Sequence, residues 1–483
     1  MIPSPAFGPE GQLSEKAPPS AEKADDGMNL LIRGARVVDP KNKIDGVLDL
    51  RIKEGRILEM GKDLPATNEK IIDAKGLVLV PGLIDLHTHF REPGHEQKET
   101  IETGSRAALR GGFVGCVSMP NTQPAGDHQG VIDNMIRKAH EVPFHLFPAG
   151  TLSKNREGKE LSEMADLKRA GIWAVTDDGS WVSDSLLMRR AMEYASMLDL
   201  LVISHCEDKR LSANGVMNEG LVSTQLGLKG IPDESEDIAV ARDIQLARLT
   251  GARLHIAHVS TERSVKLIRE AKAEGILVTA EATPHHLCLT DRSVEGYNTN
   301  FKMNPPLRSA QDVEAVQRGL LDGTLDSVAT DHAPHTEEEK MLEFDEAPFG
   351  VIGLETALAV CLTELVHTKK MNIAELLTRL SARPAEILKL PAGFGEIRKG
   401  TEANLALVDL HEEWEVASDD FISKSKNSCF IGKKLKGRVA ATLCRSKLWI
   451  YRNGLKEEEG ARSGLERKET GAPKRAAVEE IKK

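Results

Sequence analysis

The sequence predicts an α/β fold: a (β/α)8 TIM-like barrel with a small β-sandwich domain formed by the N- and C-terminal segments. Residues 81–390 alternate eight short apolar runs with stretches of helical periodicity, and eight such units favour a closed barrel over an open sheet. Residues 28–80 and 391–455 instead contain short strand-like runs separated by turn residues, which is typical of all-β structure. We therefore expect one barrel domain and one composite sandwich domain.

The two terminal segments carry similar strand signals. The first segment contains the apolar runs LLIRGARVVD, GVLDLRIKEG, RILEMG and GLVLVPG. The second returns to this style with NLALVDL, GRVAATLC and KLWIYRNG. Short strands with turn punctuation at both ends of the chain indicate one sandwich built from the two termini.

The middle segment contains the predicted barrel strands, which read LIDLH, FVGCVSMP, FHLFPAG, WAVTDDG, LVISHC, LHIAHVS, ILVTAEATP and DSVATDHAP. Helical stretches lie between them, among them ETIETGSRAALRGG, SLLMRRAMEYASML, DIAVARDIQLARLTG and ERSVKLIREAKAEG. Strict alternation of strand and helix predicts a parallel sheet with helices outside it.

The outermost residues differ in composition from the rest. Residues 1–27 are rich in Pro, Gly, Ala and charge, which predicts a disordered extension. Met28 directly precedes the first strand-like run, so it is a candidate for the translation start. Residues 456–483 mix both charge signs and have few large apolar groups, which predicts a charged, solvated tail.

Composition excludes several classes of function. The 483 residues carry a formal net charge of −10, so the chain lacks the excess of basic residues that is typical of nucleic-acid-binding proteins. No run approaches the ~20 apolar residues of a membrane span. Six cysteines without a CxxC pair indicate reduced thiols and a cytoplasmic protein. We expect a small-molecule substrate and neither nucleic acid nor membrane as a partner.

Most of the predicted barrel strands end, on their C-terminal side, in a histidine, aspartate or asparagine. These strand-end residues are His87, His89, Asn121, Asp177, Asp178, His205, His258 and Asp331. A single one is easily explained as a buried, hydrogen-bonded histidine or a capping aspartate, and Asp-Asp-Gly is also a common turn. Because barrel enzymes assemble their sites at the C-terminal ends of the strands, we expect the whole set to meet at one mouth.

The His87-Thr88-His89 segment has the spacing of half a zinc site. Side chains alternate along a strand, so both imidazoles point to the same face. Two more strand-end histidines and two carboxylates complete a set for a pair of metals. Metal-assisted hydrolysis of a C–N bond, or its reverse, is the reaction class that this set indicates.

Further polar residues indicate the kind of substrate. Arg91, two residues beyond His89, offers a planar fork for a carboxylate. Asn121 and Asn304 can both donate and accept hydrogen bonds, as an amide or urea requires. His335 lies on a proline-bearing loop and could bind a carboxylate. A small anionic substrate that carries an amide fits these groups.

Specific motifs occur in order along residues 29–455: DLHTHFREPG, MPNTQP, TDDG, SHCED, AHVST, EATPHHL, KMNPPLR, ATDHAPHTEEEK and GEIRKGTEANLALVD. Together they resemble the amidohydrolase superfamily and, more narrowly, dihydroorotases of the long bacterial type. The resemblance implies interconversion of N-carbamoyl-L-aspartate and L-dihydroorotate in pyrimidine (UMP) biosynthesis. It also implies two zinc ions per subunit, a homodimer, and association with aspartate transcarbamoylase as a further option.

The resemblance also assigns roles to individual residues. The implied metal ligands are His87, His89, Asp178, His205, His258 and Asp331. Asp331 is in addition the implied general acid/base, and Asp178 is chosen over Asp177 by motif register alone. The implied substrate contacts are Arg91, Asn121, Asn304, His335 and the backbone at Phe349 and Gly350.

Two alternatives remain. Another cyclic-amide hydrolase, such as a dihydropyrimidinase or allantoinase, generally uses a carboxylated lysine as the metal bridge. Residues 171–179 contain no lysine, and MPNT together with MNPPLR favours a dihydroorotase. The second alternative is a non-catalytic dihydroorotase-like scaffold for aspartate transcarbamoylase. Such proteins tend to lose metal ligands, whereas all six are present here.

Overall fold

The computed structural model describes residues 28–451. The predictions for residues 1–27 and 456–483 therefore lie outside the described residues, and so does the end of the predicted sandwich at 452–455. Within residues 28–451, none of the helices combines the length and the apolarity that a membrane span requires.

An eight-stranded parallel barrel forms the centre of the molecule, as predicted. Its strand order is β15-β14-β13-β10-β9-β8-β7-β6, and a parallel bridge joins Thr88 at the end of β6 to His332 in the segment that follows β15. Each predicted apolar run contains one of these strands. The strands are β6 (Leu83–Thr88), β7 (Phe113–Ser118), β8 (His145–Gly150), β9 (Ala174–Val175), β10 (Leu201–Ser204), β13 (Leu254–Ile256), β14 (Val278–Ala282) and β15 (Ser327–Val328).

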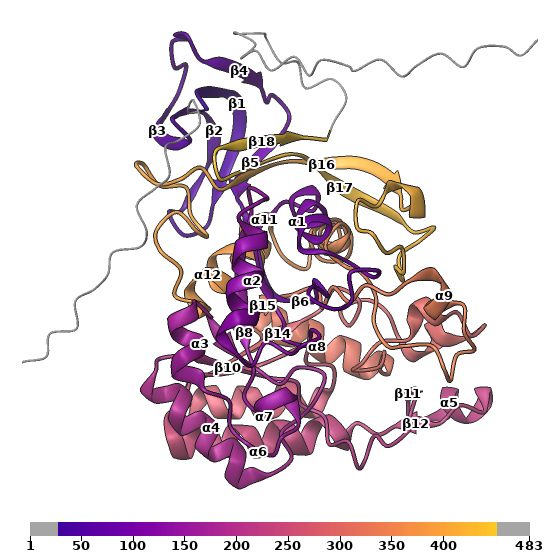
Figure 1. The fold of residues 1–483 in the computed structure, drawn as a ribbon. Coiled ribbons are helices and arrows are strands. Elements are labelled where there is room, and N and C mark those ends of the chain that lie inside the picture. Colours follow the sequence, from indigo (N-terminus) through magenta and orange to yellow (C-terminus); the bar gives the residue numbers. More distant parts are fainter. Residues whose placement is uncertain (1–27, 452–483) are drawn as a thin grey trace, which may run out of the picture.

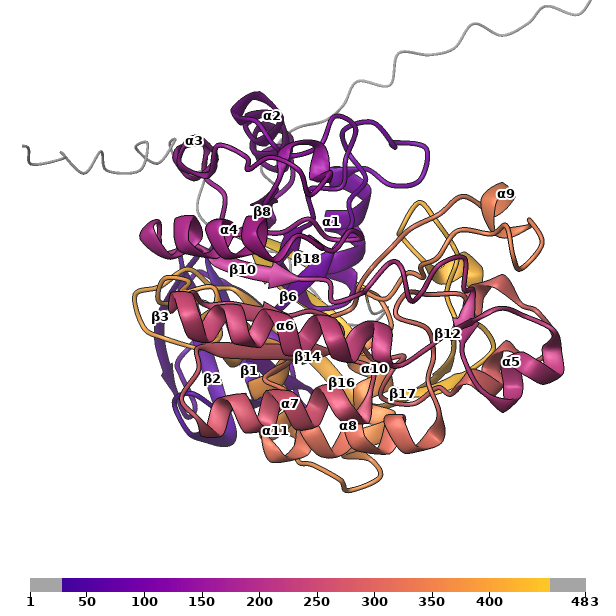
Figure 2. The same cartoon turned by 90° about the horizontal axis from the view of Figure 1, so that it is seen from below.

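Helices cover the outside of the barrel. Figure 2 shows α4, α6, α7 and α8 packed side by side along one flank. The helices are α1 (Ile101–Arg110), α2 (Gln129–Ala139), α3 (Met164–Ala170), α4 (Ser185–Met197), α5 (Leu221–Leu226), α6 (Glu234–Thr250), α7 (Glu262–Ala273), α8 (Ala310–Asp322), α9 (Glu337–Lys340), α10 (Ala357–Cys361), α11 (Ile373–Leu377) and α12 (Arg383–Ile387). All four helical stretches quoted from the sequence form helices.

Local signals explain where these helices begin and end. The Thr100 side chain accepts a hydrogen bond from the Thr103 amide and completes a capping box at the start of α1. The Asp184 carboxylate caps α4 by accepting hydrogen bonds from the Leu186 and Leu187 amides. Gly251 ends α6 with a left-handed backbone (φ 69°), which glycine adopts without steric cost.

Both ends of the described chain meet in a second eight-stranded sheet (Figure 1). Its strands are β1 (Leu30–Asp39), β2 (Ile44–Lys53), β3 (Arg56–Gly61), β4 (Lys70–Asp73), β5 (Val78–Pro81), β16 (Leu405–Glu415), β17 (Lys434–Cys444) and β18 (Lys447–Ile450). The N-terminal β5 pairs antiparallel with the C-terminal β16, with Pro81 opposite Leu405. The sheet has an apolar core of its own, which includes Ile32, Leu50 and Leu407. The exact domain boundaries at 80/81 and 390/391 stay a prediction.

The second sheet anchors the first barrel strand. β5 ends at Pro81 and β6 begins at Leu83. Between them, the Gly82 amide donates to the Asn404 carbonyl, and the Ser381 hydroxyl donates to the Gly82 carbonyl. The strand that carries His87 is therefore held at its start by both parts of the structure.

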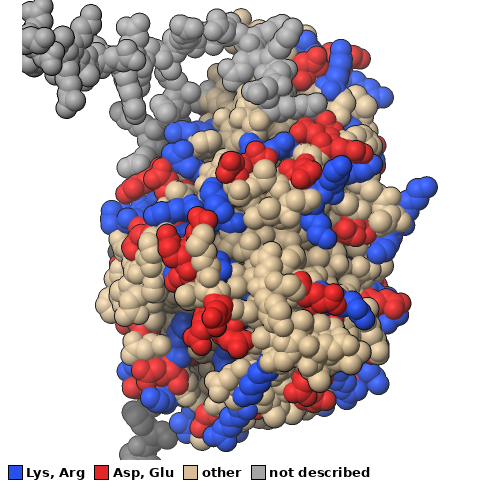
Figure 3. All heavy atoms as spheres, turned by 90° about the vertical axis from the view of Figure 1, so that its right-hand side faces the viewer, with Lys and Arg blue, Asp and Glu red and all other residues tan. Residues whose placement is uncertain are grey.

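A small excursion leaves the barrel near its mouth. β11 (Met217–Asn218) and β12 (Gly230–Ile231) form a two-stranded parallel ribbon, and α5 lies between them in sequence. On the face of the molecule shown in Figure 3, positive and negative side chains are intermixed. This face therefore presents no extended field of one sign that would attract a polyanion.

Candidate metal centre and substrate pocket

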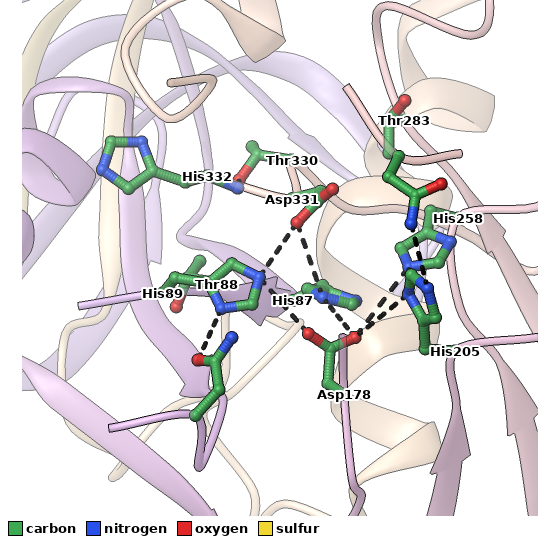
Figure 4. A network of polar contacts seen from close by, with 12 residues as sticks. His87, Thr88, His89, Asp178, His205, His258, Thr283, Thr330, Asp331 and His332 are labelled. Atoms are coloured by element: carbon green, nitrogen blue, oxygen red, sulfur yellow. Dashed lines mark hydrogen bonds and ion pairs between the residues drawn. The ribbon is translucent and has the colours of Figure 1, made fainter. Parts of the chain in front are cut away.

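Six of the residues singled out at the predicted strand ends meet inside the barrel mouth (Figure 4). His87 lies on β6, and the others lie in the residues that follow their strands. They are His87, His89, Asp178, His205, His258 and Asp331, and all six are buried. The barrel geometry explains this convergence, because the carboxyl ends of all its strands open on the same side.

The first cluster consists of His87, His89 and Asp331. Asp331 Oδ1 lies 3.1 Å from His89 Nε2 and 3.5 Å from His87 Nε2. One ligand atom from each residue lies within 4.8 Å of the other two. Two imidazoles and a carboxylate at this spacing could hold one metal ion.

The second cluster shares His87 and adds Asp178 and His258, again with ligand atoms within 4.8 Å of one another. Asp178 Oδ1 lies 3.1 Å from His87 Nε2 and 3.9 Å from His258 Nε2. His205 joins this cluster, because its Nδ1 lies 2.9 Å from His258 Nε2 and 3.7 Å from Asp178 Oδ1. Asp178 also approaches His89, so its carboxylate stands between the two clusters.

The adjacent aspartates 177 and 178 have different partners. Asp177 Oδ1 accepts hydrogen bonds from the Leu152 and Ser153 amides at 2.8 and 3.0 Å, and its Oδ2 accepts one from the Ser153 hydroxyl. Asp177 thus ties down the loop after β8, whereas Asp178 faces the histidines. Gly179, which directly follows Asp178, has a left-handed backbone with φ of 75° and turns the chain after the pair.

Two candidate ligands, His87 and His89, each use the ring nitrogen that faces away from the clusters to make a hydrogen bond. His87 Nδ1 lies 3.2 Å from Glu281 Oε1, and His89 Nδ1 lies 2.8 Å from Asn121 Oδ1. Because both partner oxygens only accept hydrogen bonds, each Nδ1 carries a proton, which leaves Nε2 as the nitrogen that faces the clusters.

His205 is oriented in the opposite sense. Its Nε2 lies 3.0 Å from Glu207 Oε2, so its Nδ1 faces the second cluster. Glu207 also accepts a hydrogen bond from Asn304 Nδ2 at 2.8 Å and one from Lys209. Glu207 therefore links a candidate metal ligand to a predicted substrate contact.

Two buried polar atoms at the centre of the site have no hydrogen-bond partner among the described residues: His87 Nε2 and Asp178 Oδ1. Buried polar atoms are almost always satisfied, and these two lie 3.1 Å apart. A divalent cation that accepts both lone pairs would satisfy them. The donor set of neutral imidazoles and carboxylates suits zinc and similar ions.

The electrostatics favour the charge states that metal ligands need. Burial alone would raise the pKa of Asp178 and Asp331, but the surrounding histidines outweigh it and lower both pKa values. Burial lowers the pKa of His89 and His205. Both carboxylates are therefore anionic and these two imidazoles neutral at pH 7. His87 differs: although burial opposes its protonation, Asp178 raises its pKa.

A cavity of about 240 Å³ opens directly above the clusters. All six predicted substrate residues line it: Arg91, Asn121, Asn304, His335, Phe349 and Gly350. Lys209 lines it as well. Five of the six predicted metal ligands, all but the fully buried His87, line the same pocket, which is large enough for a small organic acid.

One wall of this pocket is cationic. Arg91 supplies the charge: it lies 3.3 Å from His335 Nε2 and donates to the Pro334 carbonyl. Lys98, behind His335 at 3.4 Å from its Nδ1, is paired with Glu339 at 2.8 Å. Burial lowers the pKa of Arg91 to about 10, so Arg91 remains charged at pH 7. Burial and then Arg91 lower the pKa of His335, which keeps that imidazole neutral. A carboxylate is the natural ligand of this wall.

The pocket's outer rim is held by a buried lysine. Lys340 Nζ donates to the Pro348 carbonyl at 2.9 Å and to the Gly350 carbonyl at 3.1 Å. Gly350 has φ of 125°, and a Cβ there would approach the Ala333 Cβ to 2.7 Å. The backbone at Phe349 and Gly350 is therefore fixed in place beside the cavity.

Three site residues adopt a left-handed backbone that non-glycine residues rarely use. The φ values are 61° at Arg91, 33° at His258 and 48° at Asp331. Such conformations cost free energy and persist where the surrounding structure holds them, commonly at functional sites. Here they turn the chain out of the strand so that these side chains enter the pocket.

Sequence reasoning missed three polar residues of this site: Glu207, Lys209 and Glu281. Glu207 lies within the quoted SHCED motif, and Lys209 follows it by one residue. Glu281 begins EATPHHL and is the penultimate residue of β14, but only histidine, aspartate and asparagine were sought at the strand ends. A buried acidic residue inside an otherwise apolar run was the available signal.

Comparison with known proteins places these motifs in context. A family model described as "Dihydro-orotase-like" matches residues 76–264. The chain is 48% identical over 424 residues to the dihydroorotase of Syntrophus aciditrophicus, covering 87% of this chain and 99% of the relative. It is 50% identical over 423 residues to the dihydroorotase of Citrifermentans bemidjiense, with the same coverage.

Solved structures with the same fold come from other cyclic-amide hydrolases. The L-hydantoinase of Arthrobacter aurescens superposes with a TM-score of 0.78 at 23% identity, covering 87% of this chain and 96% of its own. The dihydropyrimidinase of Brevibacillus agri gives a TM-score of 0.75 at 24% identity, covering 88% and 95%. At this level of identity the likeness establishes the barrel with its additional sheet.

Proposed function

This chain belongs to the dihydroorotase family, and on that premise we propose that its six clustered residues form a two-zinc centre beneath a carboxylate-binding pocket. The activity is the interconversion of N-carbamoyl-L-aspartate and L-dihydroorotate, a step of pyrimidine biosynthesis. The predicted homodimer and the association with aspartate transcarbamoylase stay predictions.

One observation supports the proposal above all. Two triads of potential ligands, one with His89 and Asp331 and one with Asp178 and His258, share His87 and lie at the floor of a single cavity. The unpartnered atoms His87 Nε2 and Asp178 Oδ1 lie between them. In this proposal His87, His89 and Asp331 hold one ion, His205 and His258 hold the other, and Asp178 lies between the two.

Zinc ions at this centre would supply Lewis-acid polarisation of the substrate carbonyl. Asp331 is the proton carrier, because its anionic carboxylate lies at the cavity floor. In hydrolysis, water adds across the ring amide: Asp331 takes a proton from the water as its oxygen joins the carbonyl carbon, and gives that proton to the leaving nitrogen as the C–N bond breaks. In ring closure, Asp331 takes that proton from the ureido nitrogen as the C–N bond forms and water leaves.

The cationic wall positions the substrate for this chemistry. Arg91 binds the carboxylate that remains outside the ring, and the neutral imidazole of His335 donates or accepts beside it. Asn121 and Asn304 approach from the strand-end loops on either side and can pair with the ureido group. Holding the carboxylate in one place fixes the reacting carbonyl over the metal centre.

Arg91→Met is expected to raise KM for dihydroorotate by about 10- to 100-fold, the cost of losing a charge-assisted contact worth about 1.5–3 kcal/mol. The change in kcat is expected to be smaller, because Arg91 does not move a proton. Steady-state kinetics would measure both parameters. Arg189→Met, on the exposed surface of α4, is the matched control, and an unchanged KM in Arg91→Met would place the carboxylate elsewhere.

The proposed function is tested by assaying purified protein in both directions before chelation, after chelation and after zinc is restored. We expect turnover that chelation abolishes and zinc recovers, with metal content measured in parallel. Dihydrouracil and hydantoin serve as comparison substrates, since they lack the carboxylate that Arg91 would bind, and are expected to react far more slowly. No turnover of dihydroorotate under any metal condition would overturn the proposal.

A further inference from the structure

A fully buried carboxylate lies behind the metal centre, on the barrel strand β14. Glu281 is 0% exposed, and it makes no ion pair with a lysine or arginine among residues 28–451. Its Oε1 lies 3.2 Å from His87 Nδ1, and its Oε2 lies 3.0 Å from His255 Nε2. A negative charge buried without a cationic side chain is costly, so its retention calls for a nearby positive charge.

The hydrogen bonds around Glu281 define where the protons lie. Each oxygen accepts from one imidazole, so His87 carries its proton on Nδ1 and His255 carries its proton on Nε2. The other nitrogen of His255, Nδ1, lies 2.8 Å from the Thr279 hydroxyl, which can donate to it. The chain of contacts from Thr279 through His255 and Glu281 therefore ends at His87 with a proton fixed on Nδ1.

With the proton held on Nδ1, the other ring nitrogen of His87, Nε2, faces two anionic groups. Nε2 lies 3.1 Å from Asp178 Oδ1 and 3.5 Å from Asp331 Oδ1. A lone pair facing two carboxylate oxygens is repulsive unless a positive charge lies among them. A metal ion there would also offset the charge of Glu281 through the imidazole ring.

From this arrangement we propose that Glu281 is a positioning residue of the metal centre: it fixes His87 as an Nε2 ligand and strengthens that ligand's binding of the metal. The inference rests on the proposed function, because it presumes that His87 binds a metal ion. Glu281 does not line the substrate pocket. It contacts the ring of His87 and, at 3.4 Å, the backbone amide of His258, and only the contact with His87 reaches a ligand nitrogen. His255, on the adjacent strand β13, holds Glu281 in place through its hydrogen bond to Oε2.

Glu281→Gln tests this assignment, because it keeps the size of the side chain and removes its charge. The variant is expected to bind one of its two zinc ions about 10- to 100-fold more weakly than the wild type does. Competition with a chromophoric chelator would measure this affinity. The melting temperature of the chelated protein separates this effect from a general loss of stability. A purely structural role would lower that temperature and leave zinc affinity unchanged, which would overturn the inference.

Asp326→Asn is the matched control. Asp326 is also a buried carboxylate that bonds β14, through the Ala280 amide at 2.9 Å, but its other partners are Lys272 and Arg383. The control is expected to lose stability and to bind zinc as the wild type does. Equal losses of zinc affinity in both variants would assign the effect to distortion of β14 and overturn the inference.

Two further results keep the outcomes distinct. If Glu281→Gln does not fold, Glu281→Asp retains the charge but withdraws it from His87 by one methylene, and zinc affinity unchanged from wild type would overturn the inference. If the wild type itself binds no zinc, the proposed two-zinc centre fails. If wild type and variant bind zinc equally well, the role of Glu281 is contradicted and the two-zinc centre is not.

Discussion

Asp331→Asn is expected to lower kcat by about 10³-fold in both directions, within the range that a positioned general acid/base contributes. The amide keeps the shape of the side chain but cannot carry the proton between water and the ring nitrogen. It also removes one negative charge from the cluster with His87 and His89. Steady-state kinetics at saturating zinc, together with measured metal content, would separate loss of the proton carrier from loss of metal.

The control for this prediction lies five residues earlier in the same segment. Asp326→Asn removes a buried carboxylate before β15, away from the pocket, and is expected to retain kcat. If Asp331→Asn keeps near-normal turnover with its metal bound, the proton carrier is a different residue.

Asp178→Ala and Asp177→Ala are expected to have opposite signatures, although the residues are neighbours. Asp178→Ala removes the carboxylate between the two clusters, so it should lose metal and nearly all activity. The loss of affinity should exceed the about 10- to 100-fold that removal of an outer-shell partner causes. Asp177→Ala leaves the Leu152 and Ser153 amides unpaired, which should lower the free energy of unfolding by about 1–3 kcal/mol.

Metal analysis and denaturant unfolding of both variants check this pair of predictions. Asp177→Ala is expected to keep its metal at temperatures where it remains folded. Metal loss in Asp177→Ala with full metal in Asp178→Ala would reverse the assignment that the hydrogen bonds support.

Much of the barrel could be predicted because its signals are local. Each apolar run that the sequence shows in residues 81–390 carries a strand, and the helical stretches between them begin at capping residues such as Thr100 and Asp184. The lengths of the strands could not be predicted. β9 and β15 are only two residues long, because the chain leaves the ladder early to turn polar residues into the mouth.

The candidate site likewise contains residues that could be predicted from the sequence and residues that could not. The strand-end histidines could be found from the sequence, since the barrel geometry requires strand ends to converge, and motif resemblance added the substrate contacts. Glu207 and Glu281 were missed because only His, Asp and Asn were sought at the strand ends. Glu207 meets His205 only two residues away, whereas the contact between Glu281 and His87 joins residues 194 apart in sequence and could not be read from local spacing.

The sequence by itself determined the alternation of strands and helices, the residues that meet at the barrel mouth and, through its relatives, the family. The tertiary structure decided which aspartate faces the histidines, which tautomer each histidine holds and where the unpartnered lone pairs lie. Periodicity and motif spacing reflect the chemistry of neighbouring residues. Proton positions and ligand geometry instead depend on hydrogen bonds between distant strands, and these exist only once the barrel has closed.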